Sequence, residues 1–193
     1  DSPFKTLQDL FDGAKKSPNT IRAATTGILS DDHLAILMAE EAAPGAIFRI
    51  VHLEGGAAQL KEIMAGNIDV AFDNVGGVVR RIASGEVRAL AVMDNERSKF
   101  LPDVPTTKEL GYPTILSNST RGIAGPKGMP EPALGKLREV LKKAMDDPAV
   151  IKRLQEVGID PTPGRGPKEA ADFIKAELAK WAPIIKASGA VVN

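Results

Sequence analysis

Cysteine is absent from this 193-residue sequence, and histidine occurs only at His33 and His52. Without cysteine there is no thiolate nucleophile, no disulfide bond and no cysteine-based zinc site. Two histidines supply few ligands for any other metal, so we expect no metal site. Aromatic residues make up only 4% of the chain, which argues against a binding mode that relies on stacking against bases or sugar rings.

A surplus of either charge is also missing, because 25 basic residues balance 25 acidic ones. Nucleic-acid-binding domains carry a basic excess, so we expect no nucleic acid partner. The sequence has no apolar run of the roughly 20 residues that a membrane helix needs. We therefore expect no direct membrane insertion. A chain that is 43% apolar has material for one substantial core or two small ones.

Helix and strand patterns alternate along the first hundred residues. We expect strands at residues 20–24, 47–53, 68–72 and 87–93. Helical patterns lie at residues 3–16, after Ser30, after Gly56 and at residues 75–83. Strands that are apolar throughout and are separated by helices are typical of a mostly parallel sheet covered on both faces. The predicted fold class is therefore α/β.

Beyond residue 100 the pattern changes. Residues 101–113 are rich in turns, and residues 114–125 have room for two short extended segments. We expect helices at about residues 131–146, 148–157 and 167–188, with a short strand near Ile159.

Three predicted strand-to-helix loops share one design, in which an apolar strand runs into small or hydroxyl residues and a helix starts at once. Helix starts present unpaired N–H groups and a partial positive charge, which suit a carboxylate or phosphate. In an open parallel sheet such loops lie where ligands usually bind. Any one loop alone is better explained as an ordinary turn, whereas three together favour anion binding. The loops are Thr25-Thr26-Gly27 with Ser30, Gly55-Gly56-Ala57, and Asp73-Asn74.

Two groups of acidic residues resemble catalytic or metal-binding sites at first sight. Asp31, Asp32 and His33 are adjacent on a helix, so their side chains diverge, and acids in a first turn are explained by the helix dipole. Asp69 and Asp73 share one face of a predicted strand, but Asp73 also stands where it would cap the next helix. We interpret these residues as structural and predict no catalytic residue.

Arg121 stands alone among small residues. Its guanidinium would suit a ligand carboxylate, and an arginine that holds two segments together would look the same, so both interpretations stay open. The sequence has no P-loop, no nucleophile elbow and no dinucleotide-binding fingerprint. We therefore expect no cofactor.

Taken in order, seven motifs resemble the solute receptors of tripartite tricarboxylate transporters, also called Bug-type receptors. The segment 101–112 is similar to the most recognisable signature of that family. The motifs are TTG (25–27), HLA (33–35), HLEGGAA (52–58), MAGNIDV (64–70), SGEVRALAV (84–92), LPDVPTTKELGY (101–112) and RGIAGPKG (121–128).

The resemblance implies a periplasmic-binding-protein-like fold of type II, in which ligand lies between two lobes. Residues 1–118 would form a near-complete α/β ligand-binding lobe. Residues 119–193, mainly helical, would return to a second lobe that is incomplete. Members of the family carry a further N-terminal segment, so we expect the chain to be N-terminally truncated, with the signal peptide absent from it.

The implied function is the periplasmic capture of a small carboxylate, such as a di- or tricarboxylate, for the membrane permease subunits of a transporter, without catalysis. Two departures from the family pattern matter. Leu29 stands where a second glycine is common, and Glu54 replaces a lysine, which disfavours an anionic ligand unless Glu54 points away or meets a ligand amine. The implied ligand-binding residues are Thr25, Thr26, Gly27, Ser30, Gly55, Gly56, Ala57, Asn74 and Arg121.

A second interpretation belongs to a different class. A ligand-sensing effector domain of a regulator with the same fold would show the same sequence features. A DNA-binding or sensor fusion in the complete gene would favour this alternative, whereas neighbouring permease genes would favour transport.

Overall fold

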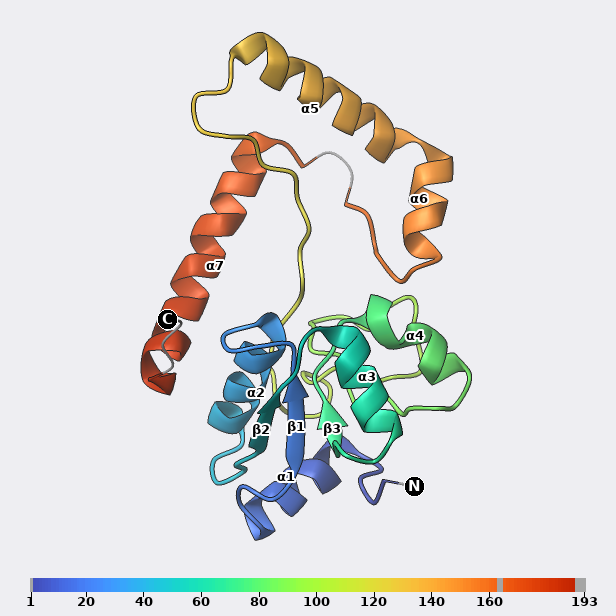
Figure 1. Ribbon diagram of the computed structural model, residues 1–193, viewed down its shortest axis with the longest axis vertical. Helices are drawn as coiled ribbons and strands as arrows, with labels where there is room; N and C mark the ends of the chain where they lie inside the picture. Colours follow the sequence, from blue (N-terminus) through green and yellow to red (C-terminus); the bar gives the residue numbers. More distant parts are fainter. Residues whose placement is uncertain (1, 163–164, 190–193) are drawn as a thin grey trace. The chain divides into compact units, whose positions relative to one another are not determined.

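The structure is a computed structural model that describes residues 2–162 and 165–189 (Figure 1). These residues form two compact units. One unit comprises the described residues up to Ser119 and from Ala179 onward, and the other is Thr120–Leu178. The elements are α1 (Leu7–Lys16), β1 (Arg22–Thr25), α2 (Asp31–Ala42), β2 (Arg49–His52), α3 (Gly56–Met64), β3 (Val70–Ala71), α4 (Val75–Ala83), α5 (Glu131–Asp146), α6 (Pro148–Gln155) and α7 (Pro167–Ser188).

The sheet of the first unit is parallel and has the strand order β2-β1-β3. In the central strand, Ala23 is paired with Ile50 on one side and with Val70 on the other. The helices α2 and α3 both pack on β1, and α3 also packs on β3. The α/β fold class predicted from the alternating pattern is therefore confirmed.

The hydrophobic core of the first unit joins one face of α1 to α2 and the sheet. Phe11 of α1, Ile36 of α2 and Ala23 of β1 are fully buried in it. Burial of a large apolar side chain contributes about 1.5–3 kcal/mol. Trp181 and Ile184, near the end of α7, pack against the edge of this core.

Residues 87–93 differ from the prediction, because they do not form a strand. Within the described residues, this segment pairs with another only through an isolated parallel bridge between Val92 and Thr106. Leu90 and Met93 pack against the core, so their apolar character reflects burial rather than membership of the sheet. Ile159 is not in a strand either, since its N–H donates to Leu154 O and closes the end of α6.

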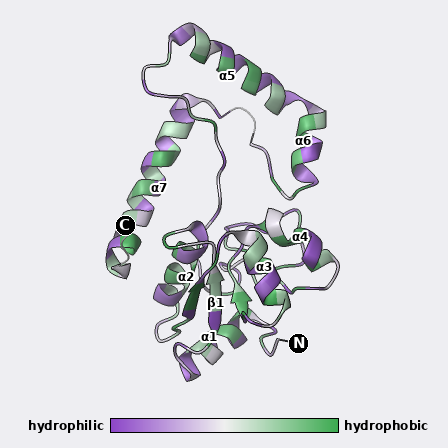
Figure 2. Cartoon of the chain, viewed as in Figure 1, coloured by the Kyte–Doolittle hydropathy of each residue, from purple (hydrophilic) through white to green (hydrophobic). Residues whose placement is uncertain are grey.

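The second unit, Thr120–Leu178, consists of α5, α6 and most of α7. Among its described residues, no side chain is buried. Leu178 is 67% exposed and Ile174 is 58% exposed. Figure 2 shows hydrophobic and hydrophilic residues alternating along α5 and α7, as amphipathic helices require. Across residues 2–162 and 165–189, no helix has the length and apolar character to cross a membrane.

Candidate functional site

The three predicted loops leave the same edge of the sheet. Because β2, β1 and β3 are parallel neighbours, their carboxyl ends lie side by side (Figure 1). From this edge the chain continues into α2, α3 and α4 respectively after β1, β2 and β3. This is the edge at which open α/β sheets usually bind ligands.

The first loop, residues 25–30, begins at a fully buried threonine. Thr25 Oγ1 lies 2.7 Å from His52 Nδ1, and it accepts the Gly27 N–H at 3.3 Å. Gly27 has a φ of +144°, which suits glycine. The loop ends at Ser30, the predicted N-cap of α2, whose Oγ accepts the His33 N–H at 3.2 Å.

Thr26, the second residue of this loop, donates hydrogen bonds to an acid of α2. Its N–H and its hydroxyl donate to Asp32 Oδ2 at 3.2 and 2.8 Å. Burial disfavours the charge on Asp32 and raises its pKa to about 6, against the opposing effect of the Thr26 hydrogen bond. The nearby carboxyl groups of Asp31 and Asp73 raise the pKa further. The hydroxyl of Thr26 is thus engaged within the chain.

The second loop presents the start of α3 without a covering side chain. Gly55 is the N-cap residue and has a φ of +86°, which is unfavourable for other residues. Gly56 and Ala57 begin the helix, so their N–H groups have no carbonyl partner four residues earlier. A side-chain carbon placed on Gly55 or Gly56 would meet no atom within 4 Å, which leaves the helix start accessible.

The third loop brings Asn74 to the first turn of α2. Asn74 is the N-cap residue of α4, but its side chain donates to Asp31 Oδ2 at 3.0 Å instead of capping its own helix. Its N–H donates to Asp73 Oδ1 at 2.6 Å. Burial is the main reason why the pKa of Asp73 is raised, and the charge of Asp31 adds to the effect. Asp31, Asp32, Asp73 and Asn74 line a cavity of about 20 Å³.

Gln59 of α3 also reaches this edge of the sheet, although no motif in the sequence indicates it. The side chain is fully buried. Its Nε2 donates to Ala24 O at 3.0 Å and to Phe72 O at 3.3 Å, so it joins the ends of β1 and β3. Its Oε1 has no hydrogen-bond partner within the described residues.

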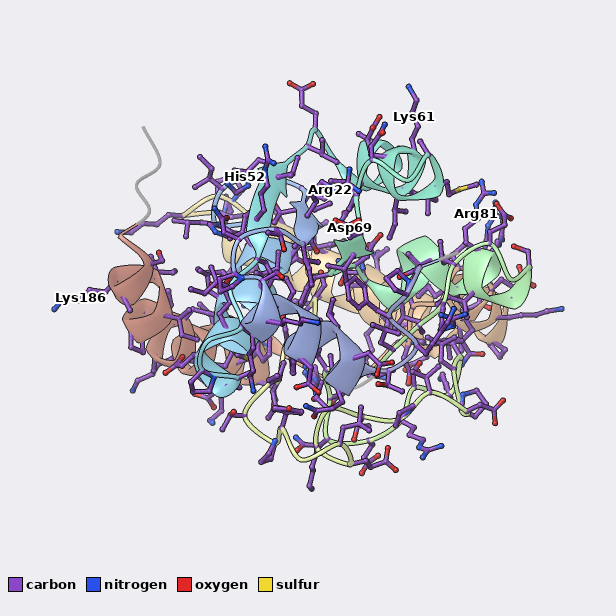
Figure 3. All side chains as sticks on the ribbon, turned by 90° about the horizontal axis from the view of Figure 1, so that it is seen from below. Arg22, His52, Lys61, Asp69, Arg81 and Lys186 are labelled. Atoms are coloured by element: carbon purple, nitrogen blue, oxygen red, sulfur yellow. The ribbon has the colours of Figure 1, made fainter. Side chains whose placement is uncertain are left out.

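Asp69 and Asp73 do not form a carboxylate pair. Asp69 binds Arg22 at 2.7 Å (Figure 3), and this hydrogen bond is the main reason why the pKa of Asp69 is lowered. Asp73 is instead bonded to Asn74. Within the described part of the chain, no three His, Asp or Glu side chains are grouped so that they would hold a metal ion. Arg121 is exposed and belongs to the second unit, so its role as a clamp stays a prediction.

The curated relatives of this chain are longer than the chain itself. A UPF0065 protein from the tcbD-tcbE intergenic region of Pseudomonas sp. is 30% identical over 186 residues, which cover 96% of this chain and 55% of that protein. Protein BugT of Bordetella pertussis is 27% identical over 184 residues, which cover 95% of this chain and 56% of BugT. The chain thus spans just over half the length of these relatives.

Several solved structures share the fold. The periplasmic binding protein BugD superposes with a TM-score of 0.85 at 27% identity, covering 98% of this chain and 63% of BugD. Rpa4515 of R. palustris, solved with adipate, gives a TM-score of 0.88 at 24% identity over 97% of this chain and 62% of that one. MatC of Rhodopseudomonas palustris, with bound malate, gives a TM-score of 0.81 at 24% identity, covering 95% of this chain and 63% of MatC. At their level of identity, the last two show the fold alone.

A family model matches nearly the whole chain. Residues 1–190 match the tripartite tricarboxylate transporter family receptor, which confirms the resemblance seen in the motifs. The chain therefore belongs to this receptor family.

Proposed function

We propose that this chain is the ligand-binding part of a periplasmic receptor that captures a small carboxylate for the membrane permease subunits of its transporter. The ligand class is a di- or tricarboxylate or a related organic acid. The observation that carries the proposal is the position of three loops, each leading into a helix start, along one edge of the parallel sheet in a member of this receptor family.

The start of α3 is the best supported carboxylate contact. The N–H groups of Gly56 and Ala57 have no partner within the helix, both residues are exposed, and the helix dipole adds a partial positive charge. Glu54, the departure that disfavours an anion, is an exposed residue. The full set of proposed ligand-binding residues is Thr25, Thr26, Gly27, Ser30, Gly55, Gly56, Ala57, Asn74 and Arg121.

The proposal includes no chemical step. Capture and release need hydrogen-bond donors and a shaped cleft, whereas hydrolysis or proton transfer needs an acid and a base within reach of the reacting atoms. Asp69 is engaged by Arg22, and Asp73 is engaged by the Asn74 N–H. These contacts support structural roles for both acids.

Thermal unfolding of the 193-residue chain with added ligands tests the proposal. The panel contains malate, adipate, citrate and aspartate, with dimethyl adipate as an uncharged control. We expect one class of carboxylate to raise the Tm, because a ligand at about one hundred times its Kd stabilises the folded state by roughly 2.7 kcal/mol. No shift with any carboxylate, or an equal shift with dimethyl adipate, would contradict carboxylate capture.

A further inference from the structure

The two histidines of the chain hold the two ends of the first loop. His52 lies at the end of β2, where its Nδ1 is 2.7 Å from Thr25 Oγ1. His33 lies in the first turn of α2, where its Nδ1 accepts the Leu29 N–H at 2.9 Å. The two imidazole rings meet edge to face, with their centroids 5.0 Å apart.

The contact between His33 and Leu29 has a counterpart at the start of α1. There the carboxylate of Asp9 accepts the Lys5 N–H at 3.0 Å, and this hydrogen bond also spans four residues. Asp9 also accepts the N–H of Thr6, the N-cap residue of α1, at 2.9 Å and so completes a capping box. His33 accepts only from Leu29, the residue before the N-cap Ser30. A carboxylate remains an acceptor throughout the neutral range, whereas an imidazole nitrogen stops accepting when it is protonated. The cap of α2 is therefore sensitive to acid in a way that the cap of α1 is not.

Leu29 has a backbone conformation that requires support. Its φ is +58°, in the left-handed region, where the side chain of a residue other than glycine is strained. The hydrogen bond to His33 Nδ1 holds the N–H of this residue. Protonated His33 would point a second N–H at the Leu29 N–H, so the bond would be lost and the strain would no longer be offset.

We infer that neutral His33 is a positioning residue, which holds Leu29 and thereby keeps the loop 25–30 in its ligand-binding shape, and that protonation of His33 releases the loop. This inference rests on the proposed role of the loop in carboxylate binding. It assigns His33 no contact with the ligand.

The surroundings of His33 favour its neutral form. Burial lowers its pKa below the ordinary 6.5, and the nearby His52 lowers it further. The titratable group that acts on it from another element is His52 of β2. On its own helix, Asp31 is bonded to Asn74 and Asp32 to Thr26.

Asp32 complicates any test by pH, because its pKa of about 6 lies near the same range and it binds Thr26 of the same loop. The titration of His33 is therefore followed by the NMR signals of its own imidazole nitrogens. Two variants separate the roles of the imidazole. His33→Gln keeps an acceptor oxygen that does not titrate, and His33→Leu removes the acceptor altogether.

Nitrogen NMR of the chain without ligand provides the first measurement. At about pH 8 we expect His33 Nδ1 to be unprotonated, and on acidification we expect the Leu29 amide signal to move with the midpoint of His33. The Leu29 signal should lose this transition in His33→Gln and should resemble the acid form at every pH in His33→Leu. A proton on Nδ1 at pH 8, or a Leu29 signal that ignores the His33 titration, would overturn the inference.

Affinity for malate and adipate provides the second measurement. The titration of the ligands is common to both proteins, so the native chain is compared with His33→Gln at each pH. We expect acid to weaken binding to the native chain by about fivefold more than to His33→Gln. Equal losses would overturn the inference. If neither ligand binds at any pH, the proposed function fails for these two carboxylates, and the NMR measurement still decides whether His33 holds the loop.

Discussion

Arg22 and Asp69 exchange hydrogen bonds in both directions. Arg22 donates to the Asp69 carboxylate from its backbone N–H at 2.8 Å and from its guanidinium at 2.9 and 2.7 Å. Asp69 returns a bond from its own N–H to Arg22 O at 3.0 Å. Arg22 is the first residue of β1, and Asp69 directly precedes β3. The pair therefore fixes the register of these two strands at their amino ends.

Asp69→Asn should destabilise the fold at neutral pH, and the difference in stability from the native chain should shrink in acid. The Arg22 hydrogen bond lowers the pKa of Asp69, so its stabilisation is complete above the ordinary 3.8 and is lost as the pH falls further. We expect a loss of about 1 kcal/mol at neutral pH, since both side chains are partly exposed. Urea unfolding of the variant measures this loss. Asp12→Asn, on the exposed side of α1, should be nearly neutral, and equal losses in the two variants would contradict the role of the pair.

Asp32→Asn should have the opposite effect. Its raised pKa means that the folded native chain takes up a proton at about pH 6, whereas the unfolded chain does so near 3.8. Ionised Asp32 therefore costs stability above about pH 6, and the cost disappears as the pH falls through this interval. Asparagine keeps an oxygen for Thr26 and carries no charge. We expect the variant to be more stable by about 1–3 kcal/mol above pH 6 and equal to the native chain near pH 4.

Urea midpoints at a series of pH values measure this difference. A variant that is less stable than the native chain at pH 8 would show that the charge of Asp32 is needed for its bond to Thr26.

Substitutions of Gly56 test the helix start of α3 as a carboxylate site. The position has open space around it, so a short side chain fits. Gly56→Asp places a negative charge where the ligand carboxylate would lie, and the helix dipole favours an acid in the first turn, so the fold should tolerate it. We expect affinity for the carboxylate identified by thermal shift to fall by about tenfold or more in Gly56→Asp.

Gly56→Asn is the matched control, because it has nearly the same shape and no charge. We expect it to retain most of the affinity in a calorimetric titration. Similar losses in both variants would mean that bulk rather than charge matters, and unchanged affinity in Gly56→Asp would remove this helix start from the site.

Gln59→Leu should destabilise the fold more than any other change proposed for α3. The substitution removes both donors that reach Ala24 O and Phe72 O and leaves these carbonyls without that partner. Loss of hydrogen bonds at a fully buried position costs about 2–3 kcal/mol in total. Urea unfolding should show this loss, while Gln8→Leu on the exposed face of α1 should change stability much less. A loss in Gln59→Leu that does not exceed the control would contradict the bridging role.

Local signals in the sequence were sufficient for most of the helices and for the α/β class. The N-cap of α2 at Ser30 was predicted from a hydroxyl residue before two acids and an apolar stripe, and it is confirmed. Helices α5 and α7 have the bounds that their periodicity and flanking prolines indicated. Capping and amphipathic periodicity act within a few residues, so they can be recognised without knowledge of the fold.

Contacts between distant segments could not be predicted in this way. The bond from Asn74 to Asp31 joins residues 43 positions apart, so no local pattern of the sequence indicates it. The wrong prediction of a strand at residues 87–93 has a related cause. An apolar run shows that a segment is buried, but its pairing depends on which strand lies beside it.

None of the described residues of Thr120–Leu178 is buried, and this should affect the rate at which their backbone amides exchange hydrogen. Ion pairs such as Lys142–Asp146 lie within single helices and contribute only tenths of a kcal/mol. Deuterium should therefore enter the amides of α5 by brief local fraying of the helix. The amides of Ala23 and Ala24, two fully buried residues of the central strand, should exchange only when the whole unit opens. The amides of α5 should therefore exchange much faster than those of the central strand of the first unit.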